Sequence, residues 1–441
     1  VAKLALNNSV PPILMASLRM GLVFIILIPF WRFKFPEKKY FKSLISFSVL
    51  MGVLVYVFMN LSLYHSSIIS PIIVGSQLAI PFGILASSLM LGENISSKKW
   101  MLIFTAFVGI IIIFFDPKLA NNILGLFFAS LMAFFFGLAQ VYSRQLKKLD
   151  TSILNSSVAL FGFIILFIMA AHGSAFPIAK LALNNSVPPI LMASLRMGLV
   201  LFILIPFWRF RIPNKKYFPP LIAFSISMGV LVYVFMNLSL YHSSIISPII
   251  LGSQLAIPFG ILASAIMLDE NISLKKWILI FCAFIGIIII FFDPKLANNF
   301  LGLFFASLMA LSFGLAQVYS RELRNLDTSL LNAFVGLFGF LILLIISFFI
   351  EKNTLLNIYL INLESWMLIS YQAIIVSLGA HLLMFYLYKF YTVGKIFPFY
   401  SLFPIFGIIL TYLVFGEVPT LMFILGGIIV ISSVFFLHKI K

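Results

Sequence analysis

The chain is divided along its whole length into apolar runs of about 20 residues, separated by short polar segments. A run of this length suits an α-helix that crosses a bilayer, whereas a strand of a membrane barrel needs about 10 alternating residues. A helix also satisfies its own backbone hydrogen bonds in lipid. Hydrophobic residues make up 63% and charged residues 9%, against about 25% charged in average soluble domains. The sequence therefore predicts an all-α polytopic membrane protein.

About fifteen transmembrane helices are expected from these runs. They are expected at 11–31, 42–64, 68–91, 98–115, 122–143, 152–176, 188–208, 219–241, 245–268, 275–292, 299–320, 329–350, 366–390, 395–415 and 419–437.

The net charge of +17 comes from short basic clusters between the apolar runs. If the spans alternate in direction, nearly all of these clusters fall on one side, for example those that begin at Arg32, Lys98, Arg144, Arg209 and Lys275. Basic loops remain cytoplasmic, which predicts a cytoplasmic C-terminus and an integral protein of a bacterial inner (plasma) membrane. No continuous basic face is visible, so nucleic acid is not an expected partner.

A large internal repeat organises the chain, because residues 1–163 reappear at 178–340 with most positions identical. The string AKLALNNSVPPILMASLRMGLV, for example, begins at both Ala2 and Ala179. The span at 152–176 is a hybrid, and its second half leads into the second copy. We therefore expect a partial duplicate over 1–163, followed by a ten-span core. In that core, 164–320 holds the first repeat with the sixth span, and 321–441 holds the remainder of the second.

An older and fainter repeat relates the two halves of the core. Both halves carry a Gly-x-Ala-x4-basic pattern in the first span and a mid-span proline with a Gly ten residues before Glu in the fourth. The matching residues are Gly173, Ala175 and Lys180 with Gly314, Ala316 and Arg321, and Pro258, Gly260 and Glu270 with Pro404, Gly407 and Glu417. Because five spans is an odd number, the halves are inverted, as in many secondary transporters.

These segments resemble the EamA-like family of the drug/metabolite transporter superfamily. The resemblance rests on GSAFPIAK, PPILMASLRMGLV, NLSLYHSSIISPIILGSQLAIPFGILAS, DENISLKKW and FGEVPT, in this order over about 160–441. It implies ten helices in two inverted repeats that move small metabolites such as amino acids. The first copy matches only the second to seventh spans of such a unit.

Polar residues within the spans are the candidate substrate-binding residues. Tyr233, Asn237 and Tyr241 share one helical face, either as a cavity stripe or as hydrogen bonds between helices. Gln254 lies upstream of Pro258, whose missing N–H leaves a carbonyl in need of a partner. Arg196 could hold an anionic group, or it could snorkel or pair with backbone carbonyls.

Three further candidates complete this set. His381 lies deep in the eighth span, where it could contact substrate, relay protons or simply bond to a neighbouring helix. Tyr400 lies on a polar face of the ninth span, and Gln317 lies on a small-residue face of the sixth.

No Asp or Glu lies deep within any predicted span. A cationic substrate would therefore lack a counter-charge, which favours a zwitterionic or anionic substrate. We expect a secondary transporter, an exporter or exchanger that works by alternating access and needs no catalytic residue, metal or cofactor. Its partners are a small-molecule substrate and the lipid bilayer, and homodimerisation stays open. The alternatives are a non-functional rearranged remnant and, with no catalytic motif in support, a polytopic membrane enzyme.

Overall fold

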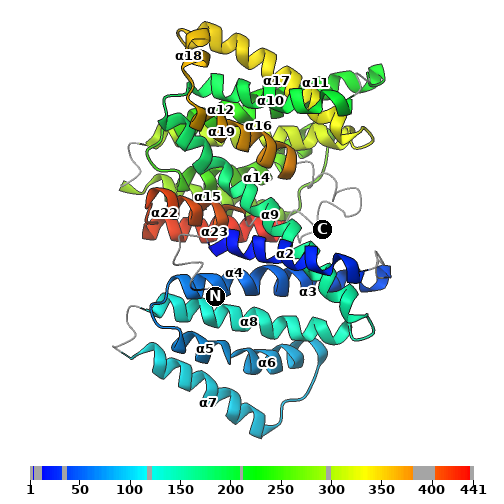
Figure 1. The fold of residues 1–441 in the computed structure, drawn as a ribbon, viewed down its shortest axis with the longest axis vertical. Helices are drawn as coiled ribbons and strands as arrows, with labels where there is room; N and C mark the ends of the chain where they lie inside the picture. Colours follow the sequence, from blue (N-terminus) through cyan, green and yellow to red (C-terminus); the bar gives the residue numbers. More distant parts are fainter. Residues whose placement is uncertain are drawn as a thin grey trace. The chain divides into compact units, whose positions relative to one another are not determined.

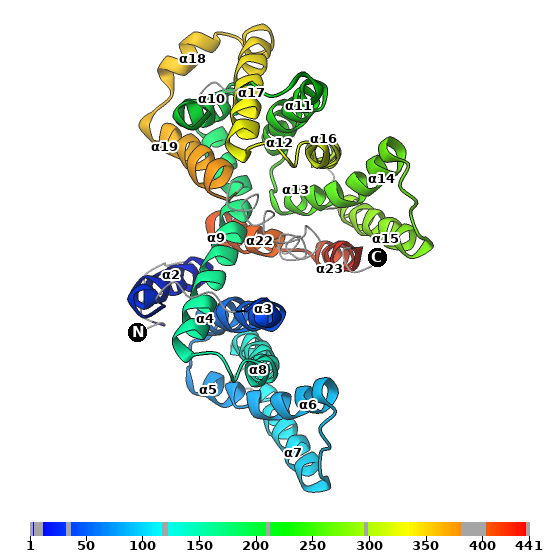
Figure 2. The same ribbon diagram turned by 90° about the vertical axis from the view of Figure 1, so that its right-hand side faces the viewer.

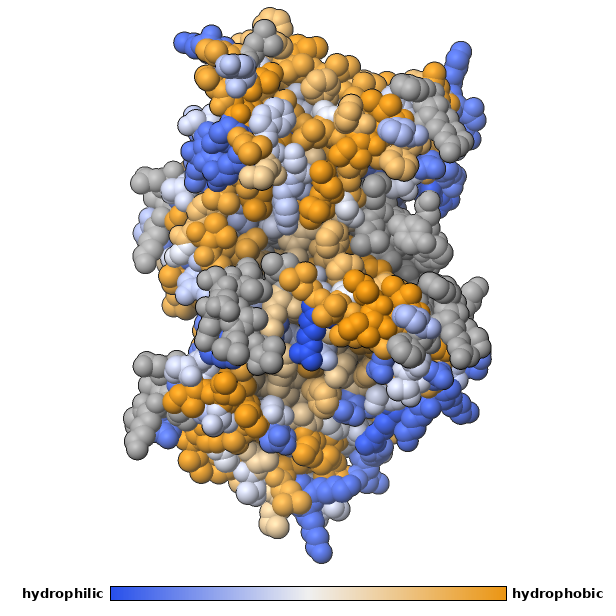
Figure 3. Space-filling view, in the orientation of Figure 1, coloured by the Kyte–Doolittle hydropathy of each residue, from blue (hydrophilic) through white to orange (hydrophobic). Residues whose placement is uncertain are grey.

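The computed structural model describes residues 3, 12–31, 37–116, 122–208, 212–294, 299–380 and 403–437, which form helices and their connections without any strand. Twelve helices of this part of the chain are long and apolar enough to cross a membrane, and three shorter apolar helices accompany them. Hydrophobic residues dominate the face drawn in Figure 3. Their broad exposure fits a protein whose solvent is lipid. The predicted all-α polytopic membrane protein is confirmed.

The first compact unit, Val1–Phe167, contains the helices of the first copy. α8 packs along α4 and α6, and α2 packs on α4 (Figures 1 and 2). The elements are α2 (Pro12–Trp31), η1 (Lys38–Tyr40), α3 (Phe41–Ser48), η2 (Val49–Val55), α4 (Tyr56–Tyr64), α5 (Ser70–Ser76), α6 (Ala79–Leu91), α7 (Ser97–Phe114), α8 (Ile123–Gln145) and the start of α9 (Thr151–Asn184).

The second unit, Ile168–Lys441, contains the rest of α9 and all later helices. α10 packs along α17, α15 along α23, and α12 and α14 both pack on α16. The elements are α10 (Pro189–Trp208), η4 (Lys215–Tyr217), α11 (Phe218–Ser225), η5 (Ile226–Leu231), α12 (Val232–Tyr241), α13 (Ser247–Gly252), η6 (Ser253–Leu255), α14 (Ala256–Leu268), α15 (Leu274–Phe291), α16 (Phe300–Glu322), α17 (Thr328–Ile350), α18 (Thr354–Leu360), α19 (Leu363–Tyr371), η8 (Gln372–Ala380), α22 (Phe403–Phe415) and α23 (Leu421–Leu437).

The hybrid span is longer than the predicted 152–176, because α9 is one helix of 34 residues. At about 1.5 Å per residue it measures about 50 Å, well beyond a hydrocarbon core of about 30 Å. Pro177 lies inside it without ending it. The predicted span ends at 176 because its length already crosses one bilayer, but the helix continues to Asn184.

Two spans of the second unit are locally wider than an α-helix. The helix from Lys215 to Tyr241 contains the π-helical segment η5, and the described segment from Leu363 to Ala380 contains the π-helical segment η8. Wide turns of this kind change which residues share a face, and they are frequent at functional sites.

The fourth span of the second unit is broken by its proline. Pro258 cannot donate a hydrogen bond to the carbonyl of Gln254, four residues earlier. The chain passes through the 3₁₀ turn η6 at this point, between α13 and α14. Beyond the break, Gly260 packs against Gly314 of α16, whose added Cβ would lie 2.7 Å from the Gly260 nitrogen. The missing side chains therefore bring α14 and α16 close together.

Candidate functional site

A cavity lies inside the second unit, among α9, α10, α12, α14 and α16, the two π-helical segments, η6 and α22. Its volume is about 80 Å³, measured as the space open to the centre of a water-sized sphere, which is room for several waters or one small solute. Its polar lining residues are His172, Arg196, Tyr233, Ser253 and Gln254. The rest of the wall is apolar, as is usual for small-molecule sites.

Arg196 of α10 is the one permanently charged side chain among the described lining residues, and it is 2% exposed. Its Nε donates to Ser377 Oγ at 3.0 Å and its Nη1 donates to Gln372 Oε1 at 2.9 Å. The guanidinium carbon lies 4.4 Å from the centre of the Tyr233 ring, in cation–π geometry. All three partners are neutral. Within the described part of the chain, no carboxylate pairs with Arg196.

The described residues use only part of the hydrogen-bonding capacity of the guanidinium. Arg has five N–H donors, and two of them bond to described residues. Beside it, the Nε2 of Gln372 is a buried donor with no hydrogen-bond partner among the described atoms. A buried cation usually has a paired anion, so these donors favour a ligand that supplies a carboxylate or phosphate.

Gln254 adds an acceptor to the same cavity. It is 2% exposed, and its Oε1 has no hydrogen-bond partner among the described residues. The local reason for its position is the 3₁₀ turn forced by Pro258. An unpaired buried amide oxygen costs about 1–3 kcal/mol, which a ligand N–H could recover.

The structure thus brings Arg196, Tyr233 and Gln254 to one cavity, and it places three other predicted residues elsewhere. Asn237 Nδ2 donates to the Pro189 carbonyl at 2.9 Å, which ties α12 to the start of α10. Tyr241 is 57% exposed and borders a separate cleft with Glu351. Gln317 lies on α16, where its Oε1 is 3.2 Å from a Cβ built on Gly260. His381 and Tyr400 lie outside the described residues.

The sequence analysis did not select Gln372 or His172. Gln372 and Ser377 are five residues apart, so an α-helix would not align them on Arg196, but both lie in π-helical η8. Mid-span amide and hydroxyl side chains were the available signal. His172 lies within α9, 4% exposed, with Nδ1 2.8 Å from the Ile168 carbonyl. Among the described residues, no group of three or more His, Cys, Asp or Glu could hold a metal ion.

Two carboxylates close the end of the second unit at which α10 and α13 begin. Glu351 accepts hydrogen bonds from the Ile190 and Leu191 N–H groups at 2.7 and 2.8 Å. Glu417 accepts from the Ile246 and Ser247 N–H groups at 2.8 and 3.1 Å. These N–H groups lack partners within their helices, and a negative charge is favourable at a helix N-terminus.

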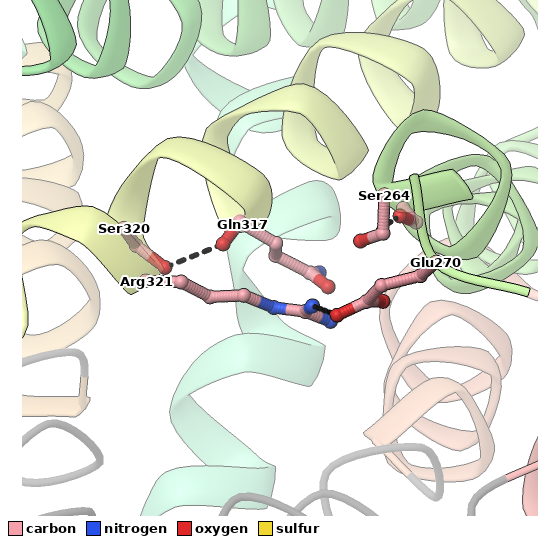
Figure 4. Close-up of polar contacts among 6 residues, drawn as sticks. Ser264, Glu270, Gln317, Ser320 and Arg321 are labelled. Carbon is pink, nitrogen blue, oxygen red and sulfur yellow. Dashed lines mark hydrogen bonds and ion pairs between the residues drawn. The ribbon is translucent and has the colours of Figure 1, made fainter. Parts of the chain in front are cut away.

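An ion pair closes the opposite end, where α14 and α16 finish. Arg321 Nη1 lies 2.8 Å from Glu270 Oε1, and both side chains are 53% exposed. Figure 4 shows Arg321 and Gln317 extending from α16 toward the end of α14. All three links join one group of helices, α9–α15, to the other, α16–α23. Each end of the cavity-bearing unit is therefore held by contacts between its two halves.

The first copy repeats part of this arrangement with a different environment. Arg19, the counterpart of Arg196, lies 4.3 Å from the ring of Tyr56, the counterpart of Tyr233. Arg19 is nevertheless exposed, and so is Gln77, the counterpart of Gln254. The first copy ends before any equivalent of η8, so it has no equivalent of Gln372 or Ser377.

The sequence matches the model of the EamA-like transporter family over residues 1–115, 166–292 and 300–438. The chain belongs to the EamA-like transporter family. The second and third matches meet between α15 and α16, and the first covers part of the duplicate. No curated protein matches the chain. As a family member with many apolar helices, this EamA-like protein is an integral membrane transporter of small molecules.

Proposed function

We propose that the second unit is a secondary transporter, an exporter or exchanger, of small zwitterionic or anionic metabolites such as amino acids. The observation that carries this proposal is the buried Arg196 guanidinium, which faces the cavity without a carboxylate partner among the described residues. A substrate carboxylate would complete its charge and could accept two parallel N–H bonds. The unpaired Gln254 oxygen would accept an N–H from a substrate ammonium group.

Alternating access is supported by the links at the two ends. Glu351 and Glu417 join the halves at one end, and Arg321–Glu270 joins them at the other. In an inverted-repeat transporter, one half rocks against the other around a central site. Opening toward one side would then break the links at that end and keep those at the other. We propose that the Arg321 end faces the cytoplasm, because the basic loops lie at that end. The C-terminus of this proposed bacterial inner-membrane protein would lie on the same side.

The test is uptake and counterflow of a labelled amino-acid and metabolite panel in proteoliposomes. Arg196→Gln should lower transport at least about tenfold, because a hydrogen bond to a charged group contributes about 1.5–3 kcal/mol. Gln254→Ala should lower it about fivefold, for the loss of one neutral hydrogen bond of about 1 kcal/mol. Arg19→Gln and Gln77→Ala are matched controls, because they make the same changes at exposed positions of the first copy.

The full chain should be compared with residues 160–441 in the same assay. Transport by the short form assigns the activity to the second unit. Should Arg196→Gln behave like the unchanged protein, the proposed site is wrong. A folded chain that moves no member of a broad panel would favour the alternative, a rearranged remnant without transport.

A further inference from the structure

We infer that the cavity selects zwitterions with one carboxylate and an uncharged, apolar side chain, such as leucine, methionine or phenylalanine. This inference rests on the proposed function and names its substrate class. The polar groups leave part of the cavity wall apolar. Three methionines from three different elements line it: Met228 of η5, Met236 of α12 and Met309 of α16.

The charges of the wall exclude several other classes. Arg196 is the one permanent charge among the described lining residues, so a single carboxylate satisfies it. The α-ammonium group of a zwitterion lies beside its own carboxylate and can donate to Gln254 Oε1, whereas a carboxylate at the end of a side chain would meet the apolar wall. No acidic residue lines the described wall, so a lysine-like or arginine-like side chain would lack a counter-charge. A buried unpaired charge is costly, and both classes should therefore bind weakly.

The apolar wall also sets the preference among neutral side chains. The three methionines are 4–7% exposed, and Phe313 and Phe403 line the same space. Burial of each additional methylene should increase affinity about fourfold. Because methionine is unbranched and flexible, such a wall adapts to different apolar shapes. We therefore expect a range of apolar amino acids to be accepted, with glycine and alanine as poor substrates.

Competition against labelled leucine counterflow by the full chain tests this inference. Unlabelled leucine, methionine and phenylalanine should inhibit at concentrations at least tenfold below those of alanine, while aspartate and lysine should inhibit least. Met236→Ser should reduce the advantage of leucine over alanine several-fold, because the polar side chain removes apolar contact. Met59→Ser is the matched control, since Met59 is the counterpart of Met236 in the first copy and lies outside the cavity. Ligand-induced thermal stabilisation in detergent gives the same ranking without a need for transport.

Two further probes separate the failure of this inference from the failure of the proposed function. Leucinamide keeps the side chain and lacks the carboxylate, and 4-methylpentanoate keeps the carboxylate and lacks the amine. Leucinamide that competes as well as leucine would overturn the Arg196 site and the inference together. An Arg196-dependent transporter that prefers aspartate, lysine or glycine would overturn the side-chain inference alone. The expected ranking, lost in Met236→Ser and kept in Met59→Ser, would establish it.

Discussion

Gly286 of α15 and Gly109 of α7 are equivalent positions of the two copies, and their surroundings differ sharply. The same Gly→Ala substitution can therefore be compared at both. A Cβ at Gly286 would lie 2.8 Å from the Gly426 carbonyl oxygen and 2.8 Å from Cγ2 of Val430, both in α23. A Cβ at Gly109 would meet nothing within 4 Å. The first copy has no equivalent of α23, and this absence explains the open space.

The size of the effect follows from two terms. Gly→Ala in a helix interior stabilises by about 0.5–1 kcal/mol, and this gain is common to both positions. At Gly286, contact with backbone atoms that cannot rotate away adds an overpacking cost of about 1–3 kcal/mol. The common gain cancels in the comparison. Gly286→Ala should therefore change the stability of the second unit by about 1–3 kcal/mol less favourably than Gly109→Ala changes that of the first.

A thiol-reactive dye can report each unit separately during thermal unfolding. The chain has one cysteine, Cys282, one helical turn before Gly286. Its counterpart in α7 is Thr105, so Cys282→Thr with Thr105→Cys moves the reporter to the first unit. A difference of 1–3 kcal/mol corresponds to roughly 2–12 °C in the unfolding midpoint for units of about 150–250 residues. Equal shifts for the two alanine variants would refute the packing of α15 on α23.

The links at the two ends give the remaining predictions. Arg321→Gln should change the transport rate in the liposome assay. Stability should fall by less than about 1 kcal/mol, because the Arg321–Glu270 pair is half exposed. Arg144→Gln, the same change in the first copy, should leave transport unchanged. Glu417→Gln and Glu351→Gln should each lower stability by about 0.5–2 kcal/mol through loss of charge at a helix N-terminus. Because they cap different helices, their effects on stability should add within about 0.5 kcal/mol. Strong non-additivity would show that the two hydrogen-bonded links are coupled and would contradict this prediction.

The helical architecture was predictable because lipid permits few spanning structures. Apolar runs and the repeat predicted nearly every described span. The length of α9 was not predicted, since nothing in its apolar pattern marks where the helix ends at Asn184. The π-helical segments were also missed, because the extra residue per turn comes from tertiary packing that periodicity does not encode.

The sequence predicted the kind of polar group at the candidate site, but only some of the residues that form it. Arg196, Tyr233 and Gln254 were selected because polar groups in lipid need a reason to be there. Gln372 was missed because an α-helical period places it away from Ser377, whereas η8 brings both to Arg196. Asn237 looked equivalent to Tyr233 on a helical wheel. Its hydrogen bond to Pro189 could be seen only once α10 was in place.

Arg19 and Arg196 show why local sequence alone cannot assign such a residue. Both follow the string PPILMASL, and both stack on a tyrosine at nearly the same distance, 4.3 and 4.4 Å. Arg196 is buried with two hydrogen-bonding partners from η8, and Arg19 is exposed. The difference comes from residues far along the chain that only one copy possesses. An effect seen at Arg196 and absent at Arg19 would therefore report the completed cavity, because helix propensity, membrane insertion and the loss of a positive charge are common to both positions.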